Sequence, residues 1–162
     1  MKKNTAIDEL LSELDRTLEV EEKIHGFYED FRDRELERMG KNRSSGLILA
    51  EILANFYTCV ETLFLRISQF FENNLRVDKW HSDLLRKMSF EIRDTRKRVI
   101  SDDSYVILIE LMKFRHFKRY YFEFEYDWDK LDSLEKKYSA LRPLLRKDLA
   151  EFRTFLEVLR QA

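Results

Sequence analysis

A run of basic and aromatic side chains between positions 113 and 120 is the part of the sequence best suited to chemistry. Its polar members are Lys113, Arg115, His116, Lys118, Arg119 and Tyr120. A helix turns about 100° per residue, so the two arginines, His116 and Tyr120 together cover about 140° of its surface. Guanidinium, imidazole and phenol groups arranged in this way suit phosphate and stacked bases. The run therefore predicts one compact anion-binding patch.

We expect this patch to lie on the protein surface and not in a buried charge network. The opposite side of the same helix carries the aromatic residues Phe114, Phe117, Tyr121 and Phe124. A helix with one apolar and one basic face directs the apolar face into the core. The alternative, and the commoner role of such residues, is that the basic side chains serve solubility or pair with carboxylates of a neighbouring helix.

A second basic run lies just before this helix, at Arg93, Arg96, Lys97 and Arg98. The acidic residues Glu91 and Asp94 are interspersed with it. We interpret the run as a solvated face, with an extension of the anion-binding track as the alternative.

The sequence motifs for other kinds of catalysis are weak. Glu22 and His25 have the Glu-x-x-His spacing of di-iron helix bundles, but such a site needs two such pairs and two further carboxylates. We therefore assign no metal and no cofactor. The sequence has no Gly-x-Ser-x-Gly turn, and Cys59 lies among apolar residues, where a small buried thiol is far commoner than a nucleophile.

The composition predicts an all-α fold. The 162 residues include three Gly and one Pro, with 44% hydrophobic and 38% charged residues. Strands, tight turns and glycine-rich phosphate loops need more Gly and Pro than this, so β-sandwiches, barrels and Rossmann or P-loop folds are excluded. Amphipathic helices with heavily charged outer faces fit the composition.

Apolar periodicity places the helices and predicts one domain over residues 1–162. The expected helices span residues 5–39, 44–73, 80–88, 105–124 and 131–159. We expect a bend near Gly26, a serine cap on the second helix, and a kink or restart near Arg142 because Pro143 lacks an amide hydrogen. The simplest packing is an antiparallel bundle of four to five helices, four of them long and one short.

The sequence favours a protein of the reducing cytoplasm. One cysteine cannot form an internal disulfide, and residues 1–4 do not lead into an apolar signal sequence. The least polar stretch, residues 44–65, is interrupted by Glu51 and Glu61, so we interpret it as a core helix and expect no membrane association.

Several short motifs follow one another along the chain: Asn55-Phe56-Tyr57 with Glu61, Trp80-His81 with Leu84, Leu85 and Met88, Phe114-Arg115-His116 with Arg119, Phe124-Glu125, and Asp127-Trp128. In their order and spacing the chain resembles the HEPN superfamily and, within it, the HepT-like toxins of prokaryotic toxin–antitoxin pairs. The resemblance implies a HEPN-type helical bundle whose homodimer lines one cleft with two copies of the fourth helix. It further implies a metal-independent endoribonuclease that acts on RNA and is restrained by an MNT-type nucleotidyltransferase antitoxin.

The resemblance also suggests roles for individual residues. In the family an Arg, four to six residues and then a His form the catalytic pair: the His moves a proton while the ribose 2′-hydroxyl attacks the phosphodiester, and the Arg holds the developing charge. Arg115 matches the Arg, but Tyr120 stands at the His position, and a phenol with a pKa near 10 is a poor base. The family's AMP-modified Tyr aligns with Phe122, which has no hydroxyl.

Three hypotheses follow from this departure. In the first, His116 takes over proton transfer, with Arg115 holding charge and Arg119, Lys118 and Lys113 binding RNA. In the second, the bundle binds RNA without cutting it. In the third, it serves as a protein-interaction module. Arg76 and His81 also have the Arg, four residues, His spacing, but they span a connection and a helix start, so we expect Trp80 and His81 to pack the short helix onto the bundle.

Overall fold

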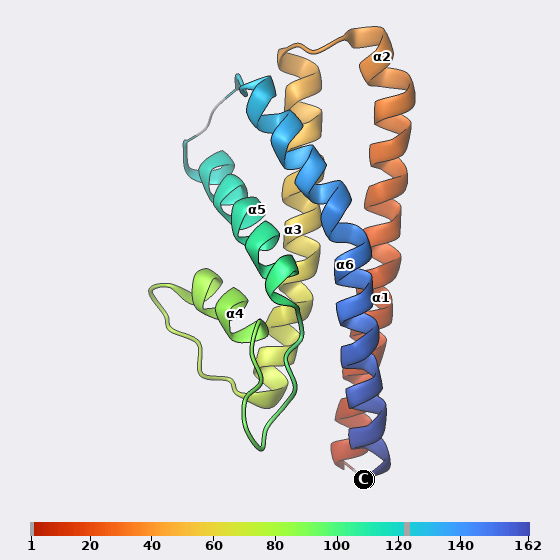
Figure 1. Ribbon diagram of the computed structural model, residues 1–162, viewed down its shortest axis with the longest axis vertical. Coiled ribbons are helices and arrows are strands. Elements are labelled where there is room, and N and C mark those ends of the chain that lie inside the picture. The colour runs from red at the N-terminus through yellow and green to blue at the C-terminus, as the bar shows by residue number, and fades with distance from the viewer. Residues whose placement is uncertain (1, 122–123) are drawn as a thin grey trace.

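A computed structural model describes residues 2–121 and 124–162 of the chain (Figure 1). The elements in order are α1 (Lys2–Asp30), η1 (Phe31–Glu35), α2 (Leu36–Met39), α3 (Arg43–Phe71), α4 (Trp80–Met88), α5 (Asp102–Tyr121) and α6 (Trp128–Gln161). The described residues form no strand beyond an isolated bridge between Ile92 and Arg96. The all-α prediction is confirmed, with four long helical segments and one short helix.

The long segments alternate in direction, as predicted for an antiparallel bundle. In Figure 1, α1 runs upward, α3 downward, α5 upward and α6 downward. The central element is α3, which contacts α1, α4, α5 and α6. Apolar side chains from all of these helices form one core cluster. Because α4 and α5 both pack on α3, side chains from three elements meet on one side of the bundle.

The first helical segment is irregular at a different place from the one predicted. Gly26 lies within α1, which continues past it without interruption. The irregularity is instead a π-helical turn, η1, in which the Leu36 amide donates to the Phe31 carbonyl. A π-helical turn contains one more residue than an α-helical turn closed by a hydrogen bond to the fourth residue. The Phe31 ring in this turn is buried. Gly40, at a φ of 72° that favours glycine, ends the segment.

The cap of α3 is an asparagine and not the predicted serine. The Asn42 side chain accepts a hydrogen bond from the Ser45 amide at 3.0 Å. In return, the Asn42 amide donates to the Ser45 hydroxyl at 2.9 Å. This reciprocal capping box satisfies amides that the first helical turn leaves without partners.

Within the described chain, α3 is the helix whose length and composition would suit a membrane span. In the bundle, however, 61% of its apolar stretch is buried by the other helices. Glu51 is exposed and Glu61 is buried with partners in neighbouring helices. These features are those of a core helix, which is the role expected from the sequence.

Of the predicted kink or restart near Arg142, the restart does not occur, because α6 is one helix from Trp128 to Gln161 with Pro143 inside it. Proline removes the hydrogen bond to the carbonyl four residues earlier, which is that of Ser139. Ser139 is exposed, so water can solvate this carbonyl. In Figure 1, α6 leans across the upper part of α3 and then runs beside α1.

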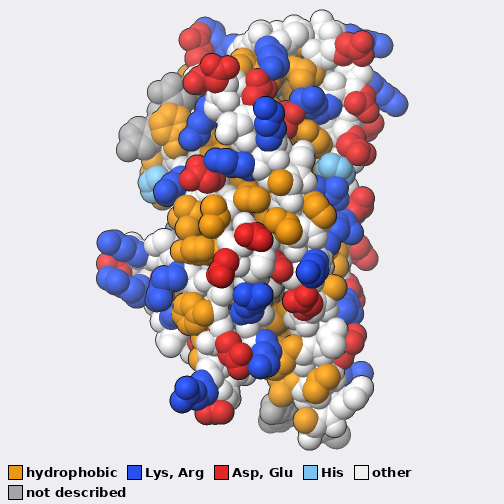
Figure 2. Space-filling view, in the orientation of Figure 1, with side chains coloured by type: hydrophobic (Ala, Val, Ile, Leu, Met, Phe, Trp, Pro, Cys, Tyr) orange, Lys and Arg blue, Asp and Glu red, His pale blue; other side chains and the backbone are white. Residues whose placement is uncertain are grey.

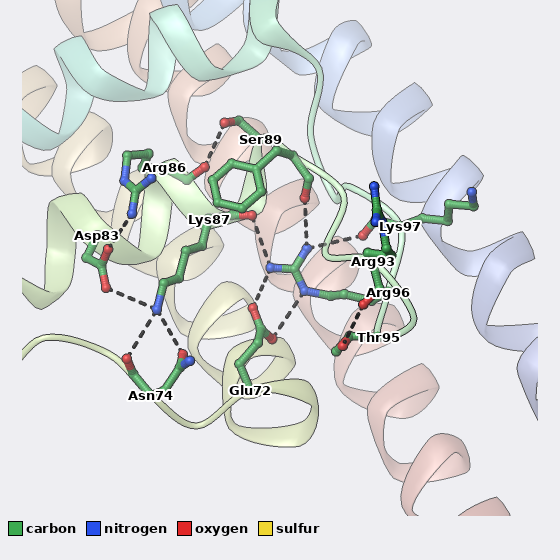
Figure 3. A network of polar contacts seen from close by, with 11 residues as sticks. Glu72, Asn74, Asp83, Arg86, Lys87, Ser89, Arg93, Thr95, Arg96 and Lys97 are labelled. Atoms are coloured by element: carbon green, nitrogen blue, oxygen red, sulfur yellow. Dashed lines mark hydrogen bonds and ion pairs between the residues drawn. The ribbon is translucent and has the colours of Figure 1, made fainter.

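A buried ion pair holds the loop after α4 against the end of α3 (Figure 3). The Arg96 side chain is fully buried and donates to both carboxylate oxygens of Glu72, at 2.5 and 3.2 Å. It also donates to the carbonyls of Lys87, Phe90 and Lys97. The expectation that this basic run is solvated is therefore wrong at Arg96, since folding of the loop encloses its guanidinium with five acceptors.

The loop before α4 is tied down in the same region. The Lys87 ammonium donates to the Asn74 carbonyl at 3.1 Å and to the Asn74 side chain at 2.8 Å, and lies 3.3 Å from Asp83 (Figure 3). Desolvation alone would raise the pKa of Asp83. Hydrogen bonds from Arg86, the Arg76 amide and Lys87 outweigh it and lower that pKa. Both connections of α4 are thus anchored, which fixes the position of its first turn relative to α5.

Candidate functional site

A groove of about 350 Å³ lies between the start of α4 and the second half of α5. From the α4 side it is lined by Asp78, Lys79, His81 and Ser82, and from α5 by Met112, Lys113, Arg115, His116, Arg119 and Tyr120. Five of the six site residues predicted from the sequence line this groove. The sixth, Lys118, lies outside it.

Arg115 is anchored to α3 and is not part of a freely exposed strip. Its side chain is only 20% exposed. The guanidinium Nε donates to the Thr58 hydroxyl at 2.7 Å, and Nη1 lies 3.8 Å from the Glu61 carboxylate. The expected surface location is therefore wrong for Arg115, because a carboxylate and a hydroxyl of α3 bind its guanidinium. This anchoring fixes the direction of the side chain at the edge of the groove.

Glu61 is a buried carboxylate that joins three helices. Its Oε2 accepts hydrogen bonds from the Tyr57 hydroxyl at 2.9 Å and from Nδ1 of His81 at 2.8 Å. Its Oε1 faces Arg115. Burial, the charge of Glu61 and the hydrogen bond to it raise the pKa of Tyr57, so this tyrosine stays a neutral donor. A buried carboxylate needs such partners to offset the loss of its hydration.

His81 enters the groove from the first turn of α4. Its ring stacks on Trp80 with centroids 3.6 Å apart, and its side chain is 34% exposed. An ionised carboxylate only accepts hydrogen bonds, so in the neutral imidazole Nδ1 carries the hydrogen toward Glu61 and Nε2 has the free lone pair. Within residues 2–121 and 124–162, Nε2 has no hydrogen-bond partner. The predicted packing role of Trp80 and His81 is thus incomplete, since His81 also reaches the groove beside Arg115.

The signal that pointed to His81 was present in the sequence. Arg76 and His81 have the family-like spacing, and Trp80-His81 contributes to the resemblance. Arg76, however, lines no part of the groove, and its guanidinium pairs with Asp78. The arginine that accompanies His81 is Arg115, from another helix.

His116 and Tyr120 lie on the exposed side of α5. Their rings are 4.5 Å apart and inclined by 40°. Tyr120 is 57% exposed, and the Arg119 guanidinium lies 5.9 Å from its ring. In the described part of the chain neither His116 nor Tyr120 contacts a carboxylate. These two side chains therefore form an open aromatic surface at the rim of the groove.

The three remaining predicted residues differ in how their charge is compensated. Lys118 donates to the Glu51 carboxylate of α3, so its charge is partly offset. Lys113 and Arg119 are exposed and form no ion pair with any residue that the structure describes. The basic patch expected from the sequence is therefore reduced to Lys113, Arg115 and Arg119 within the groove.

Two of the aromatic residues expected in the core are exposed. Phe114 is buried as predicted, but Phe117 is 40% and Phe124 68% exposed. A second cavity, of about 510 Å³, separates the end of α5 from the start of α6, and Phe117 lines it. Because α6 does not close against this end of α5, the core stops near Phe114. The side chain of Tyr121 and all of Phe122 lie outside the described residues.

The other sequence candidates occupy structural positions. Nδ1 of His25 is 2.8 Å from the Tyr138 hydroxyl, and Nε2 is 3.2 Å from Glu29. Burial, followed by the negative charge of Glu21, raises the pKa of the Cys59 thiol to about 11, which disfavours the nucleophilic thiolate. In the described ranges no three His, Cys, Asp or Glu side chains gather as a metal-binding group would.

Comparison with known families gives a match. A family model described as HepT-like protein matches residues 48–156, about two thirds of the chain. No curated protein and no solved structure gave a significant match. The matched span contains most of α3, all of α4 and α5, and most of α6, and thus every residue that lines the groove.

Proposed function

Because the chain belongs to the HepT-like family of HEPN-type helical proteins, we propose that it is a toxin-type endoribonuclease that needs no metal ion. In this proposal it acts on RNA as a homodimer and is restrained by an MNT-type nucleotidyltransferase antitoxin in the cytoplasm. The observation that carries the proposal is the groove in which Arg115 lies beside two imidazoles, those of His81 and His116.

The reaction is an intramolecular transesterification of RNA. The ribose 2′-oxygen forms a bond to the neighbouring phosphorus and the bond from phosphorus to the 5′-oxygen breaks, which leaves a 2′,3′-cyclic phosphate and a 5′-hydroxyl. An imidazole accepts the 2′-hydroxyl proton, and a fixed guanidinium stabilises the negative charge that develops on the phosphate oxygens. Arg115 is suited to the second role because Thr58 and Glu61 hold its guanidinium in one orientation.

We assign substrate binding to the exposed residues around Arg115 and the imidazole that accepts the proton. Lys113 and Arg119 line the groove, form no ion pair with the described residues, and would contact phosphates. Tyr120 and His116 present ring faces on which bases can stack. Lys118 would contribute less, because Glu51 offsets its charge.

Self-association of α5 is part of the proposal. The outer side of α5 exposes the apolar side chain of Val106, 63% exposed, as well as Tyr120. Figure 2 shows apolar side chains gathered near the middle of the face that α5 and α6 present, surrounded by charges of both signs. Light scattering of the purified protein should give twice the 19.8 kDa mass of one chain. A monomeric mass at micromolar concentration would contradict the homodimer.

The activity is tested with purified protein and a mixed RNA pool in the presence of EDTA. We expect cleavage products with 2′,3′-cyclic phosphate ends. Arg115→Ala should lower the cleavage rate about 10²- to 10³-fold, since it removes a donor aimed at the developing charge. Arg98→Ala, which removes an exposed cation of the loop before α5, is the matched control and should leave the rate unchanged. Absence of cleavage by the wild-type protein would overturn the proposal.

The toxin role is tested in cells. Expression of the chain alone should arrest growth, and co-expression of a nucleotidyltransferase encoded beside it should restore growth. Expression of the Arg115→Ala variant at the same level should be harmless, since arrest in this proposal depends on cleavage.

The second candidate is a bundle that binds RNA or a protein but no longer cuts RNA. The observation that favours it is Tyr120 at the position where the family resemblance expects the catalytic His, because a phenol is a poor base at neutral pH. In that case RNA binding should be measurable and steeply salt-dependent without any cleavage product.

A further inference from the structure

We infer that His81, and not His116, moves the proton in this reaction, held by Glu61 beside the guanidinium of Arg115. The inference rests on the proposed ribonuclease activity and names a catalytic residue for it. It starts from a contact between α3 and α4 that brings an imidazole into the groove opposite the α5 residues.

One carboxylate positions both groups. Oε2 of Glu61 lies 2.8 Å from Nδ1 of His81, and Oε1 lies 3.8 Å from Nη1 of Arg115. A carboxylate that binds one ring nitrogen orients the imidazole, sets which nitrogen carries the hydrogen, and stabilises the imidazolium formed when the other nitrogen accepts a proton. The same carboxylate keeps the imidazole next to the cation that would bind the phosphate.

The surroundings of His81 keep this geometry rigid. Glu61 is buried and is also held by the Tyr57 hydroxyl at 2.9 Å. The His81 ring is stacked on Trp80, and α4 is anchored by Lys87, which binds Asn74 of the preceding loop, and by Arg96, which binds both the Lys87 carbonyl and Glu72. A catalytic group whose orientation is fixed before substrate binds loses less conformational entropy in the transition state.

His116 lacks the carboxylate partner and the buried surroundings that hold His81. It is exposed, its ring contacts Tyr120, and no carboxylate among the described residues holds either ring nitrogen. Its side chain can therefore adopt several rotamers at the rim of the groove. This environment suits stacking on a base better than proton transfer in one defined direction.

Bonds and protons balance in the proposed step. Nε2 of His81 takes the proton from the 2′-hydroxyl while the 2′-oxygen bonds to phosphorus. The bond to the 5′-oxygen breaks, and this oxygen takes a proton from a water molecule. The resulting hydroxide removes the proton from the imidazolium, which restores His81. Throughout, the charge of Glu61 favours the imidazolium, and Arg115 binds the phosphate oxygens.

A purely structural role for His81 makes a different prediction. If His81 and Arg115 only compensate the buried charge of Glu61, any side chain that donates to Glu61 should preserve function. Asparagine can place its amide nitrogen near the position of Nδ1, but it has no atom that could accept a proton at the position of Nε2. His81→Asn therefore keeps a hydrogen bond to Glu61 but removes the atom that accepts the proton.

The experiment compares the cleavage rates of wild type, His81→Asn and His116→Asn. We expect His81→Asn to lower the rate about 10²- to 10⁴-fold, the usual contribution of general acid–base catalysis. Its melting temperature and its affinity for a 2′-O-methyl RNA, which cannot be cleaved, should match those of wild type. His116→Asn should weaken binding of the 2′-O-methyl RNA and lower the cleavage rate by no more than about tenfold, because it loses stacking and not proton transfer.

A second measurement covers the case in which His81→Asn alters the fold. Added imidazole should restore part of the cleavage rate of His81→Ala, which a structural role would not produce. Cleavage by His81→Asn at the wild-type rate would overturn this inference and leave the ribonuclease proposal standing. If wild type cleaves no RNA at all, the proposed function itself fails.

Discussion

At the scale of single residues, Glu61 determines the character of the site. A buried carboxylate is costly unless donors and cations surround it; here Tyr57 and His81 form hydrogen bonds with Glu61, and the Arg115 guanidinium lies 3.8 Å away. Whatever the function of the groove, Glu61 holds α4 and α5 against α3 through these contacts. Its neighbours differ in exposure: Tyr57 is buried, whereas His81 and Arg115 reach the groove.

Replacement of Tyr57 by Phe should therefore destabilise the protein. The change removes a hydrogen bond to a buried charged group, which contributes about 1.5–3 kcal/mol to the free energy of unfolding. Urea denaturation followed by circular dichroism measures the difference. Tyr120→Phe is the matched control: its ring is exposed, so the free energy of unfolding should change by less than about 0.5 kcal/mol. Equal effects of the two substitutions would contradict the role given to Glu61.

At the scale of elements, the position of α4 depends on the pair between Arg96 and Glu72. Both side chains are buried, and the carbonyls that Arg96 binds belong to the end of α4 and the loop after it. Since α4 carries His81, this pair contributes to the geometry of the groove from a distance.

We expect Arg96→Met to lower the free energy of unfolding by about 3–5 kcal/mol, because it leaves Glu72 buried without its cation. The double variant Arg96→Met with Glu72→Met should be less destabilised than Arg96→Met alone, since no buried charge remains. Lys97→Met, which breaks the exposed pair with Glu91, should cost less than about 1 kcal/mol. Chemical denaturation of the three variants checks this order, and a double variant less stable than Arg96→Met would contradict it.

The start of α3 offers a second test at this scale. Asn42→Ala removes the side-chain acceptor of the capping box and should cost about 0.5–2 kcal/mol in the free energy of unfolding. Ser44→Ala changes the exposed serine next to the one that completes the box, and should cost much less. A larger loss for Ser44→Ala in thermal or urea unfolding would mean that the cap lies elsewhere.

At the scale of the whole molecule, the charge distribution matters more than its sum. The net charge is −1, and Figure 2 shows acidic and basic side chains interspersed on the face it presents. Cations near α5 are paired with carboxylates in several places, as Lys118 is with Glu51. Binding of a polyanion would therefore depend on the few basic residues of the groove whose charge is not offset.

This distribution predicts how RNA affinity varies with salt. Each phosphate contact with a single strand contributes about 0.7 to the slope of log K against log salt concentration. Arg119→Gln should therefore lower the slope by about 0.7, whereas Lys118→Gln should change it less because Glu51 already compensates this charge. Fluorescence anisotropy with a 2′-O-methyl RNA measures the slopes, with Arg98→Gln as control. Equal slopes for wild type and Arg119→Gln would exclude Arg119 from the binding surface.

The all-α fold class, and most of the α5 residues that line the groove, could be predicted from the sequence. Helices form from contacts three and four residues apart, so apolar spacing and the scarcity of Gly and Pro were enough to predict them. For the same reason the spacing of Arg115, His116, Arg119 and Tyr120 was enough to place them on one helix face.

Which groups contact that face of α5 depends on how the helices pack. Glu61 contacts His81 across 20 positions of the chain, and Thr58 contacts Arg115 across 57. Helical periodicity carries no information about such pairs, because they arise when whole helices pack and enclose a carboxylate that must then find donors on its neighbours. The anchoring of Arg115 to α3 and the position of His81 beside it are consequences of that packing.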